Sequence, residues 1–122
     1  MATPANMPIS IRLDRDFILS VTELTDEGNP WDLRGMKIAF AIKGNITDPD
    51  SRALFLTEHF YTSDLAFGHY SFRVPLSATS GSGWSSTASA SFEVVYQDPT
   101  GITQTRLEGP VAIGPSVLVT VP

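Results

Sequence analysis

The sequence feature that most constrains the fold is an alternating segment, residues 36–43, which follows a stretch rich in turn-forming residues. Larger apolar residues alternate with small or charged ones: Met36, Ile38, Phe40 and Ile42 against Lys37, Ala39, Ala41 and Lys43. A period of two predicts a strand with one buried face. In the preceding stretch, residues 26–35, Gly28 can adopt a positive φ and Pro30 fixes its own φ, which indicates a structured turn.

The same pattern predicts further short strands along the whole chain. They are expected at residues 9–13, 17–22, 53–57, 69–74, 90–96, 102–107, 111–113 and 116–121. Residues 58–68 indicate a loop or irregular edge, and 98–101 a tight hairpin turn, while Gly109-Pro110 and Gly114-Pro115 are expected to bracket 111–113. No segment shows a helical period. We expect an all-β fold, an immunoglobulin-like antiparallel β-sandwich with an extended N-terminal arm, and keep a small barrel as the alternative.

The length of 122 residues fits one domain. We expect an arm over residues 1–8 and a single sandwich domain over 9–122. Residues 76–91 are rich in Ser, Ala, Thr and Gly, a composition typical of linkers, but the strand expected at 90–96 needs partners from the first half. No disulfide can form because Cys is absent, and the sequence predicts neither a signal peptide nor a membrane span.

Charge is unevenly distributed along the chain. The net charge is −5 with scattered basic residues, so we expect no nucleic-acid partner. Residues 1–11, 74–92 and 109–122 contain no Asp, Glu, Lys or Arg. Interface cores are depleted of charge, so we expect other subunits to cover these three tracts, the alternative being that Ser and Thr solvate them. The candidate interface residues are Met1, Pro4, Met7, Pro8, Trp84, Val117, Val119 and Val121.

The sequence predicts no catalytic, cofactor or metal site. His59 and His69 are the only candidate bases, and no neighbouring pattern would orient either of them. These two residues alone are also too few ligands for zinc. The pairs Asp14-x-Asp16 and Asp48-x-Asp50 would suit a calcium loop but are equally common in solvated turns, which we favour.

Exposed aromatic residues leave a carbohydrate-binding module as the alternative function. β-Sandwich modules often hold sugars on such residues, and Trp31 and Trp84 are the candidates here. The competing interpretation is that each aromatic packs in the core or against a subunit. Because Trp31 follows Pro30 in a turn and precedes a core strand, we expect it to cover one end of the sandwich.

The order of these features resembles the N-terminal domain of phage baseplate upper proteins and related tail proteins. The residues that carry the resemblance are Ile9–Leu13, Asp14–Asp16, Phe17–Val21, Asp26, Gly28, Pro30, Asp32, Leu33, Gly35, Met36–Ile42, Phe92–Tyr96, Asp98, Gly101, Thr103, Thr105 and Gly109–Val111. The family often has Arg-Gly-Asp where this chain has Arg12-Leu13-Asp14, and it continues into a C-terminal extension that leads to receptor-binding parts.

The resemblance implies a sandwich-like assembly platform of the virion without catalytic residues. Its partners would be other virion proteins or further copies of the chain in a symmetric assembly, with contact to a host glycan possible. The protein would be made in the host cytoplasm and end in the virion, either in the tail or baseplate or on the capsid as a decoration protein. No nucleic acid, membrane or cofactor is implied.

Overall fold

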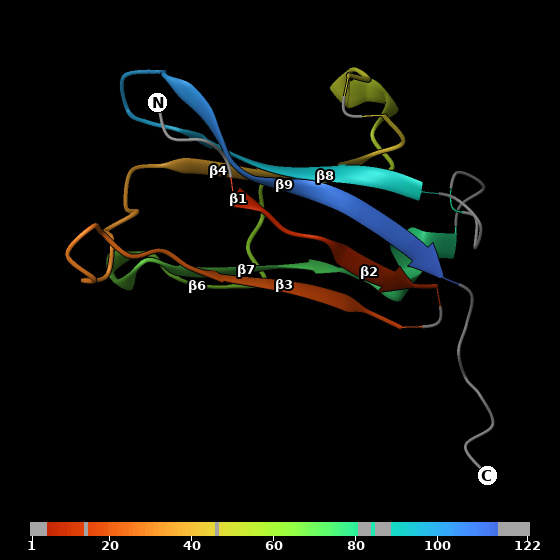
Figure 1. Cartoon of the computed structure of the whole chain (residues 1–122), viewed down its shortest axis with the longest axis horizontal. Helices are drawn as coiled ribbons and strands as arrows, with labels where there is room; N and C mark the ends of the chain where they lie inside the picture. Colours follow the sequence, from red (N-terminus) through yellow and green to blue (C-terminus); the bar gives the residue numbers. More distant parts are fainter. Residues whose placement is uncertain (1–4, 14, 46, 81–83, 85–88, 115–122) are drawn as a thin grey trace, which may run out of the picture.

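The computed structural model describes residues 5–13, 15–45, 47–80, 84 and 89–114, which form two β-sheets packed face to face (Figure 1). The larger sheet has the order β1-β9-β8-β4-β5, with β2 also paired to β9, and the smaller has the order β3-β7-β6. This confirms the expected all-β, sandwich-like architecture. In this described part of the chain, no helix is long and apolar enough to cross a membrane.

The strands are short and are joined by turns and three 3₁₀ helices. The strands are β1 (Ala5–Asn6), β2 (Ile9–Arg12), β3 (Phe17–Thr22), β4 (Lys37–Lys43), β5 (Phe55–Thr57), β6 (Thr62–Asp64), β7 (His69–Val74), β8 (Ser89–Gln97) and β9 (Thr103–Gly114). The 3₁₀ helices are η1 (Asp50–Arg52), η2 (Leu65–Phe67) and η3 (Leu76–Ser80). The strands predicted from alternation in the first half of the chain therefore form, within a few residues of their expected bounds.

The core consists of the inward-facing residues of both sheets, as period-two alternation predicts. Phe40 on β4 lies at its centre, with ring centroids 5.6 Å from Phe72 on β7 and 6.1 Å from Phe92 on β8. All three side chains are fully buried. Such aromatic pairs add about 0.5–1.5 kcal/mol each beyond the area that they bury. In β7, where a strand was expected at 69–74, the alternate residues Tyr70, Phe72 and Val74 are all fully buried.

Two features of the larger sheet correct the expected antiparallel architecture. β1 and β2 run parallel to β9, so the sheet is mixed. In addition, Gly109-Pro110 is not a break: β9 continues through it for twelve residues, because Gly109 and Pro110 pair with Phe92 and Ser91 of β8. Pro110 has no N–H to donate, and the parallel ladder on the other side of β9 is interrupted there, between β1 and β2.

The outer face of β4 also differs from the expected pattern. The alternation predicted that Ala41 and Lys43 would face solvent, but both residues are buried. The Lys43 ammonium lies 2.9 Å from Asp50 and 3.6 Å from Glu93 on β8. Asp50 belongs to the segment after β4, which rises above the larger sheet at the yellow-to-olive lobe in Figure 1. The strand is buried on both faces there because this segment folds back over it.

The predicted turn between residues 26 and 35 is present. Gly28 and Gly35 both have positive φ, at 84° and 89°. The Trp31 amide donates to the carbonyl of Glu23, and Leu33 is fully buried. Residues 58–68, expected to be a loop or irregular edge, contain the short strand β6 at the edge of the smaller sheet. The long connection between β3 and β4 is therefore fixed at one end of the sandwich.

Candidate assembly surface

Parts of the three charge-free tracts, residues 5–11, 89–92 and 109–114, lie side by side in the larger sheet. The rest of the described part of the tract 74–92 lies elsewhere, with Val74 on β7 and residues 76–80 in η3. Ile9 on β2 pairs with Val111 on β9, and Val111 pairs with Ala90 on β8. Residues 5–11, 89–92 and 109–114, which are far apart in the sequence, thus form one corner of one sheet (Figure 1). The absence of charge in these three segments is therefore a property of one continuous surface.

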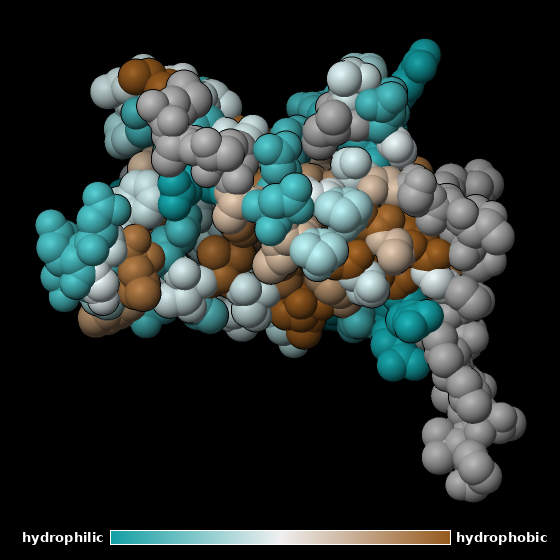
Figure 2. Space-filling model, in the orientation of Figure 1, coloured by the Kyte–Doolittle hydropathy of each residue, from teal (hydrophilic) through white to brown (hydrophobic). Residues whose placement is uncertain are grey.

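The outer face of this corner carries small uncharged side chains. Alternation directs Ile9, Ile11, Val111 and Ile113 into the core, where all four are buried. The side chains left outside are Asn6, Pro8, Ser10, Ser91, Pro110 and Ala112, of which only Ser91 is half-buried. We call these six residues the neutral face. Figure 2 views the molecule from the side where β2 and β9 run, and there brown and tan residues are interspersed with teal and pale ones.

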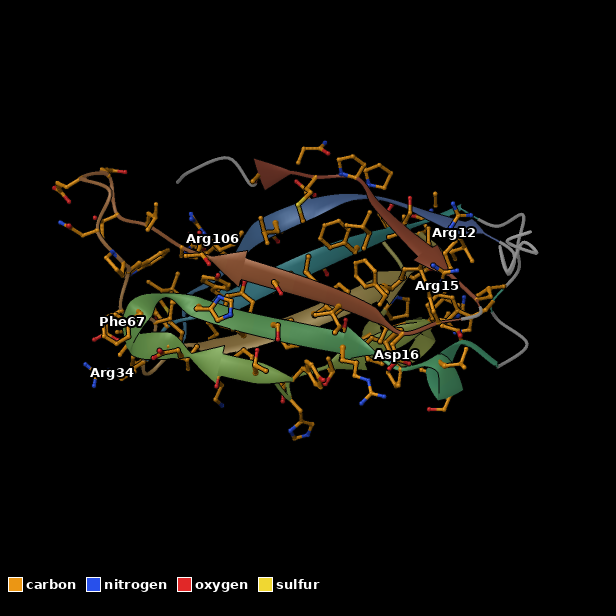
Figure 3. The ribbon with its side chains drawn as sticks, turned by 90° about the horizontal axis from the view of Figure 1, so that it is seen from below. Arg12, Arg15, Asp16, Arg34, Phe67 and Arg106 are labelled. Atoms are coloured by element: carbon orange, nitrogen blue, oxygen red, sulfur yellow. The ribbon has the colours of Figure 1, made fainter. Side chains whose placement is uncertain are left out.

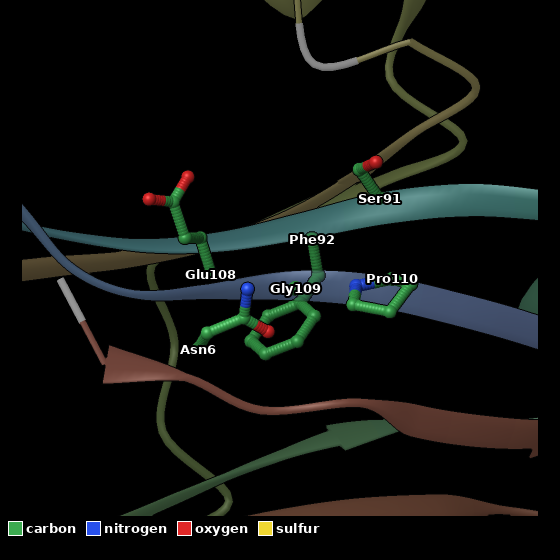
Figure 4. Close-up of a pocket in the computed structure, with 6 residues that line it drawn as sticks. All are labelled: Asn6, Ser91, Phe92, Glu108, Gly109 and Pro110. Atoms are coloured by element: carbon green, nitrogen blue, oxygen red, sulfur yellow. The ribbon is translucent and has the colours of Figure 1, made fainter.

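The N-terminal arm is held against β9 by a close backbone approach. The Met7 amide donates to the Glu108 carbonyl at 2.9 Å. A Cβ atom on Gly109 would overlap the Met7 carbonyl group, so only glycine allows the arm to cross β9 at this point. Beside the crossing lies an open pocket of about 290 Å³ lined by Asn6, Ser91, Phe92, Glu108, Gly109 and Pro110. Figure 4 shows the Phe92 ring directed to one side of β9, with Glu108 and Ser91 on the other.

The structure describes three of the eight interface residues predicted from sequence. Met7 is half-buried and packs against the core, Pro8 is exposed on the neutral face, and Trp84 is half-buried against the core. Met1, Pro4, Val117, Val119 and Val121 lie outside the described residues. Ser10, Pro110 and Ala112 were not predicted individually, although the charge-free tracts contain them; pairing them required the parallel register of β2 on β9.

Trp31, one of the two candidate sugar-binding residues, lies beside Arg106 of β9, at the end of the larger sheet away from Gly114. The Arg106 guanidinium lies 5.1 Å from the centre of the Trp31 ring, and the ring of Tyr96 is 6.1 Å from it. Arg106 also makes two hydrogen bonds of 3.1 Å to the Glu23 carboxylate. An open pocket of about 350 Å³ adjoins these groups, lined by Leu24, Thr25, Asp26, Glu27, Trp31 and Arg106.

A β-bulge explains why Arg106 reaches this corner. Val94 pairs with Leu107 and Val95 with Thr105, so Arg106 is the extra residue on β9. Figure 3 shows Arg106 beside β9, near the end of β3. The hydrogen bonds that Arg106 donates to the Glu23 carboxylate raise the pKa of Arg106 above its ordinary value. The ion pair thus ties the end of β3 to β9, and nothing in the sequence spacing predicted it.

The other chemical candidates are dispersed in the fold. Asp16 pairs with Arg73 at 2.8 Å, Asp48 accepts a hydrogen bond from the Asn45 amide, and Asp14 lies outside the described residues. His59 is exposed after β5, whereas His69 on β7 is 3.2 Å from the Thr22 hydroxyl. Among the residues that the structure describes, no group of three or more His, Asp or Glu side chains could hold a metal ion.

Comparison of the sequence with models of known protein families finds no match, and comparison with curated proteins finds none either.

Proposed function

We propose that this chain is a non-enzymatic structural protein of a bacteriophage particle that acts through subunit–subunit contacts. The observation that carries the proposal is that parts of three charge-free tracts, residues 5–11, 89–92 and 109–114, meet at the neutral face. Uncharged tracts that arose by chance would be expected at unrelated places on the surface. A surface that is buried in an assembly is depleted of charge over its whole area, because interface cores contain few charged residues. The small side chains of the neutral face allow a neighbour's backbone to come close.

The fold that we propose in detail is immunoglobulin-like. The two sheets, β3-β7-β6 and β9-β8-β4-β5, have the strand order of the BED and GFC sheets of such domains with one added C′ strand. From β3 to β9 the strands would take the positions B, C, C′, D, E, F and G. The segment before β3 would serve as the arm, and β1 and β2 anchor its described part to β9.

The assignment to a phage particle rests on the resemblance of the turn at 26–35, its flanking strands and the closing hairpin to baseplate upper proteins and related tail proteins. In this proposal the protein is made in the bacterial cytoplasm and incorporated into the tail, the baseplate or the capsid surface. Its partners are other virion proteins or further copies of itself. Apolar contact would supply most of the binding free energy, and the absence of charge avoids the cost of burying ions.

A charge placed on the neutral face tests the proposal. Ala112 is exposed, and its replacement by Lys leaves the core unchanged while introducing a charge that an interface would have to bury. We expect Ala112→Lys to fold normally and to reduce incorporation into phage particles by at least tenfold, as measured by quantitative mass spectrometry of purified virions. Ser63→Lys on β6 is the matched control, an exposed residue of the other sheet. Equal incorporation of both variants would contradict the proposal.

A carbohydrate-binding module remains the second candidate because Trp31 adjoins an open pocket with two carboxylates. Against it, the Trp31 ring already contacts Arg106 and Tyr96, as a residue that covers one end of the core would. Trp84 also packs against the core, although its chain neighbours lie outside the described residues. Glycan-array binding that disappears in Asp26→Asn and Glu27→Gln, two exposed positions whose change leaves Trp31 in place, would favour this function over assembly.

A further inference from the structure

β3 is an edge strand whose length and composition set it apart from the other edges of the two sheets. Among the described strands, β3 pairs only with β7. The other edges are short or protected: β1 has two residues, β5 and β6 have three, and β2 follows a proline and ends at Arg12. β3 has six residues, none of them charged or proline. Edge strands of this kind normally carry a charge, a proline or a bulge that prevents pairing with another chain.

The register of β3 identifies the backbone groups at its open edge. The Glu23 amide donates to the Gly68 carbonyl, which continues the β3–β7 ladder by one pair. Hydrogen-bonded pairs recur at every second residue of an antiparallel ladder, so Val21 and Leu19 bond to β7 and Ser20 does not. The Ser71 carbonyl, opposite Ser20, indeed accepts from Tyr61 on the far side of β7. The N–H and C=O groups of residues 18, 20 and 22 therefore point toward the open edge.

The side chains of the same residues are suited to an added strand. Ile18, Ser20 and Thr22 lie on the outer face of the smaller sheet, and Ile18 is 47% exposed. Figure 3 shows β3 between β2 and β7, with its arrow running opposite to that of β2. A strand paired with β3 would satisfy its backbone edge and cover part of Ile18 by cross-strand contact.

The segment Ser116–Val121 of this chain has the chemistry to occupy that edge. It has six residues, the same number as β3, and none is charged. Val117, Val119 and Val121 alternate with Ser116, Leu118 and Thr120, and β-branched residues favour extended structure. Six extended residues span about 20 Å, which is the length of a strand of this size.

The position of Gly114 argues that the segment comes from a second copy. Gly114 ends β9 opposite Arg12, in the larger sheet, whereas β3 lies in the other sheet. Within one copy the chain would have to cross the roughly 10 Å between the sheets, which takes about three residues and so uses part of Ser116–Val121 itself. The rest of this segment would then run parallel to β3 and would be too short to pair with all six residues of β3. A segment from a neighbouring copy has neither constraint.

We propose that Ser116–Val121 of one copy adds as an antiparallel strand to the open edge of β3 in another copy. This inference deepens the proposed assembly function and rests on it. Donor and acceptor are different surfaces, so the contact is head-to-tail, and repetition gives a ring or an open chain of subunits. The neutral face is on the other sheet and remains available for a different neighbour.

Two pairs of proteins test the proposal by sedimentation velocity across protein concentrations. We expect the full chain to self-associate and a version truncated after Pro115 to do so at least tenfold more weakly. Ser20→Pro removes an edge N–H that β7 does not use, so the fold should persist while self-association falls by a similar factor. Ser20→Ala keeps that N–H and is expected to associate as the unchanged protein does. Circular dichroism confirms that both variants fold.

A peptide of residues 115–122, added to the truncated protein, provides the second readout. We expect it to slow hydrogen exchange at the amides of Ile18, Ser20 and Thr22 at least tenfold, and to do so in Ser20→Ala but not in Ser20→Pro. The proposal is overturned if the peptide leaves these amides unprotected, or if truncation does not change self-association. It is also overturned if the full chain is a monomer whose Ser20 amide is protected at every concentration, because that identifies pairing within one copy.

The outcome can be separated from the proposed function. If truncation has no effect while Ala112→Lys still reduces incorporation into particles at least tenfold, the strand-addition proposal fails and the assembly function stands. If the full chain neither self-associates nor enters particles, both fail together.

Discussion

The hydroxyl groups of Tyr70 and Tyr96 lie 2.7 Å apart inside the core and join the two sheets by a hydrogen bond. Tyr70 is on β7 of the smaller sheet and Tyr96 on β8 of the larger one, and both side chains are almost completely buried. Their rings also meet nearly edge to face, with centroids 6.1 Å apart. A polar contact at this depth fixes the position of one sheet relative to the other, because either hydroxyl would lose its partner if the sheets moved.

A double-mutant cycle on this pair measures the contact. Tyr70→Phe leaves the Tyr96 hydroxyl without this buried partner, and Tyr96→Phe does the same to Tyr70, so we expect each to lower the free energy of unfolding by about 1–3 kcal/mol. The double variant should lose clearly less unfolding free energy than the sum of the losses of the two single variants, because neither hydroxyl of the pair then remains without its partner. Urea denaturation of the four proteins provides the comparison. Additive losses would show that the hydrogen bond contributes nothing of its own.

The same pair makes the fold sensitive to alkaline pH. Burial, followed by the Tyr70 hydroxyl, raises the pKa of Tyr96, and burial also raises the pKa of Tyr70. The folded state thus holds both phenolic protons more tightly than the unfolded chain, in which Tyr titrates near pH 10. The contribution of these two protonated tyrosines to the free energy of unfolding is fully present below about pH 10 and falls as the pH rises above it. Urea denaturation from pH 8 to 11.5 should show that the free energy of unfolding falls more steeply with pH for the unchanged protein than for the Tyr70→Phe/Tyr96→Phe variant. Parallel curves would show that the tyrosine pair is not the cause of the alkaline loss.

Two glycines with the same backbone requirement should differ strongly in mutational cost. Gly28 has φ of 84° and no atom within 4 Å of a built Cβ, so Gly28→Ala is expected to cost about 1–2 kcal/mol for the left-handed conformation alone. Gly68 has φ of 74°, and a Cβ there would lie 2.5 Å from the Glu23 carbonyl oxygen and 2.8 Å from that of Trp31. Gly68→Ala should cost about 3 kcal/mol or more. Chemical denaturation of both variants decides this, and equal losses would show that the 23–35 connection yields to the new methyl group.

The features that sequence predicted and those that it missed differ in the range of the interactions behind them. The turn at Gly28 and the inward faces of β4 and β7 follow from a residue's own conformational limits and from local alternation. The burial of Lys43 depends on Asp50 and Glu93, which arrive from other segments. Gly109-Pro110 has the composition of a break, but pairing with β8, together with the pairs that β1 and β2 make on either side of it, keeps it in an extended strand.

The candidate assembly surface likewise depends on contacts between distant segments, which the sequence does not reveal. The sequence located its uncharged tracts but could not show that they meet, because strand register over long sequence separation leaves no local signal. The position of Arg106 over Trp31 likewise depends on a one-residue bulge opposite Val94 and Val95. A bulge changes which way a side chain points without changing its composition, so neither the ion pair with Glu23 nor the pocket beside it was predictable.

The crossing of the arm over β9 provides a test of how the arm is held. Gly109→Ala would place a methyl group against the Met7 carbonyl, so the arm must move away, and the bond from the Met7 amide to Glu108 should be lost. We expect hydrogen exchange of the Met7 amide to accelerate at least tenfold, while the amides of β8 opposite stay protected because β8 and β9 remain paired. Ala112→Ser, a similarly small change on the outer side of the same strand, is the control and should leave Met7 protected. If Gly109→Ala also leaves Met7 protected, the arm adapts to the methyl group and the close approach does not determine its path. If β8 loses protection as well, the glycine serves the sheet as a whole rather than the arm, and the neutral face would depend on it directly.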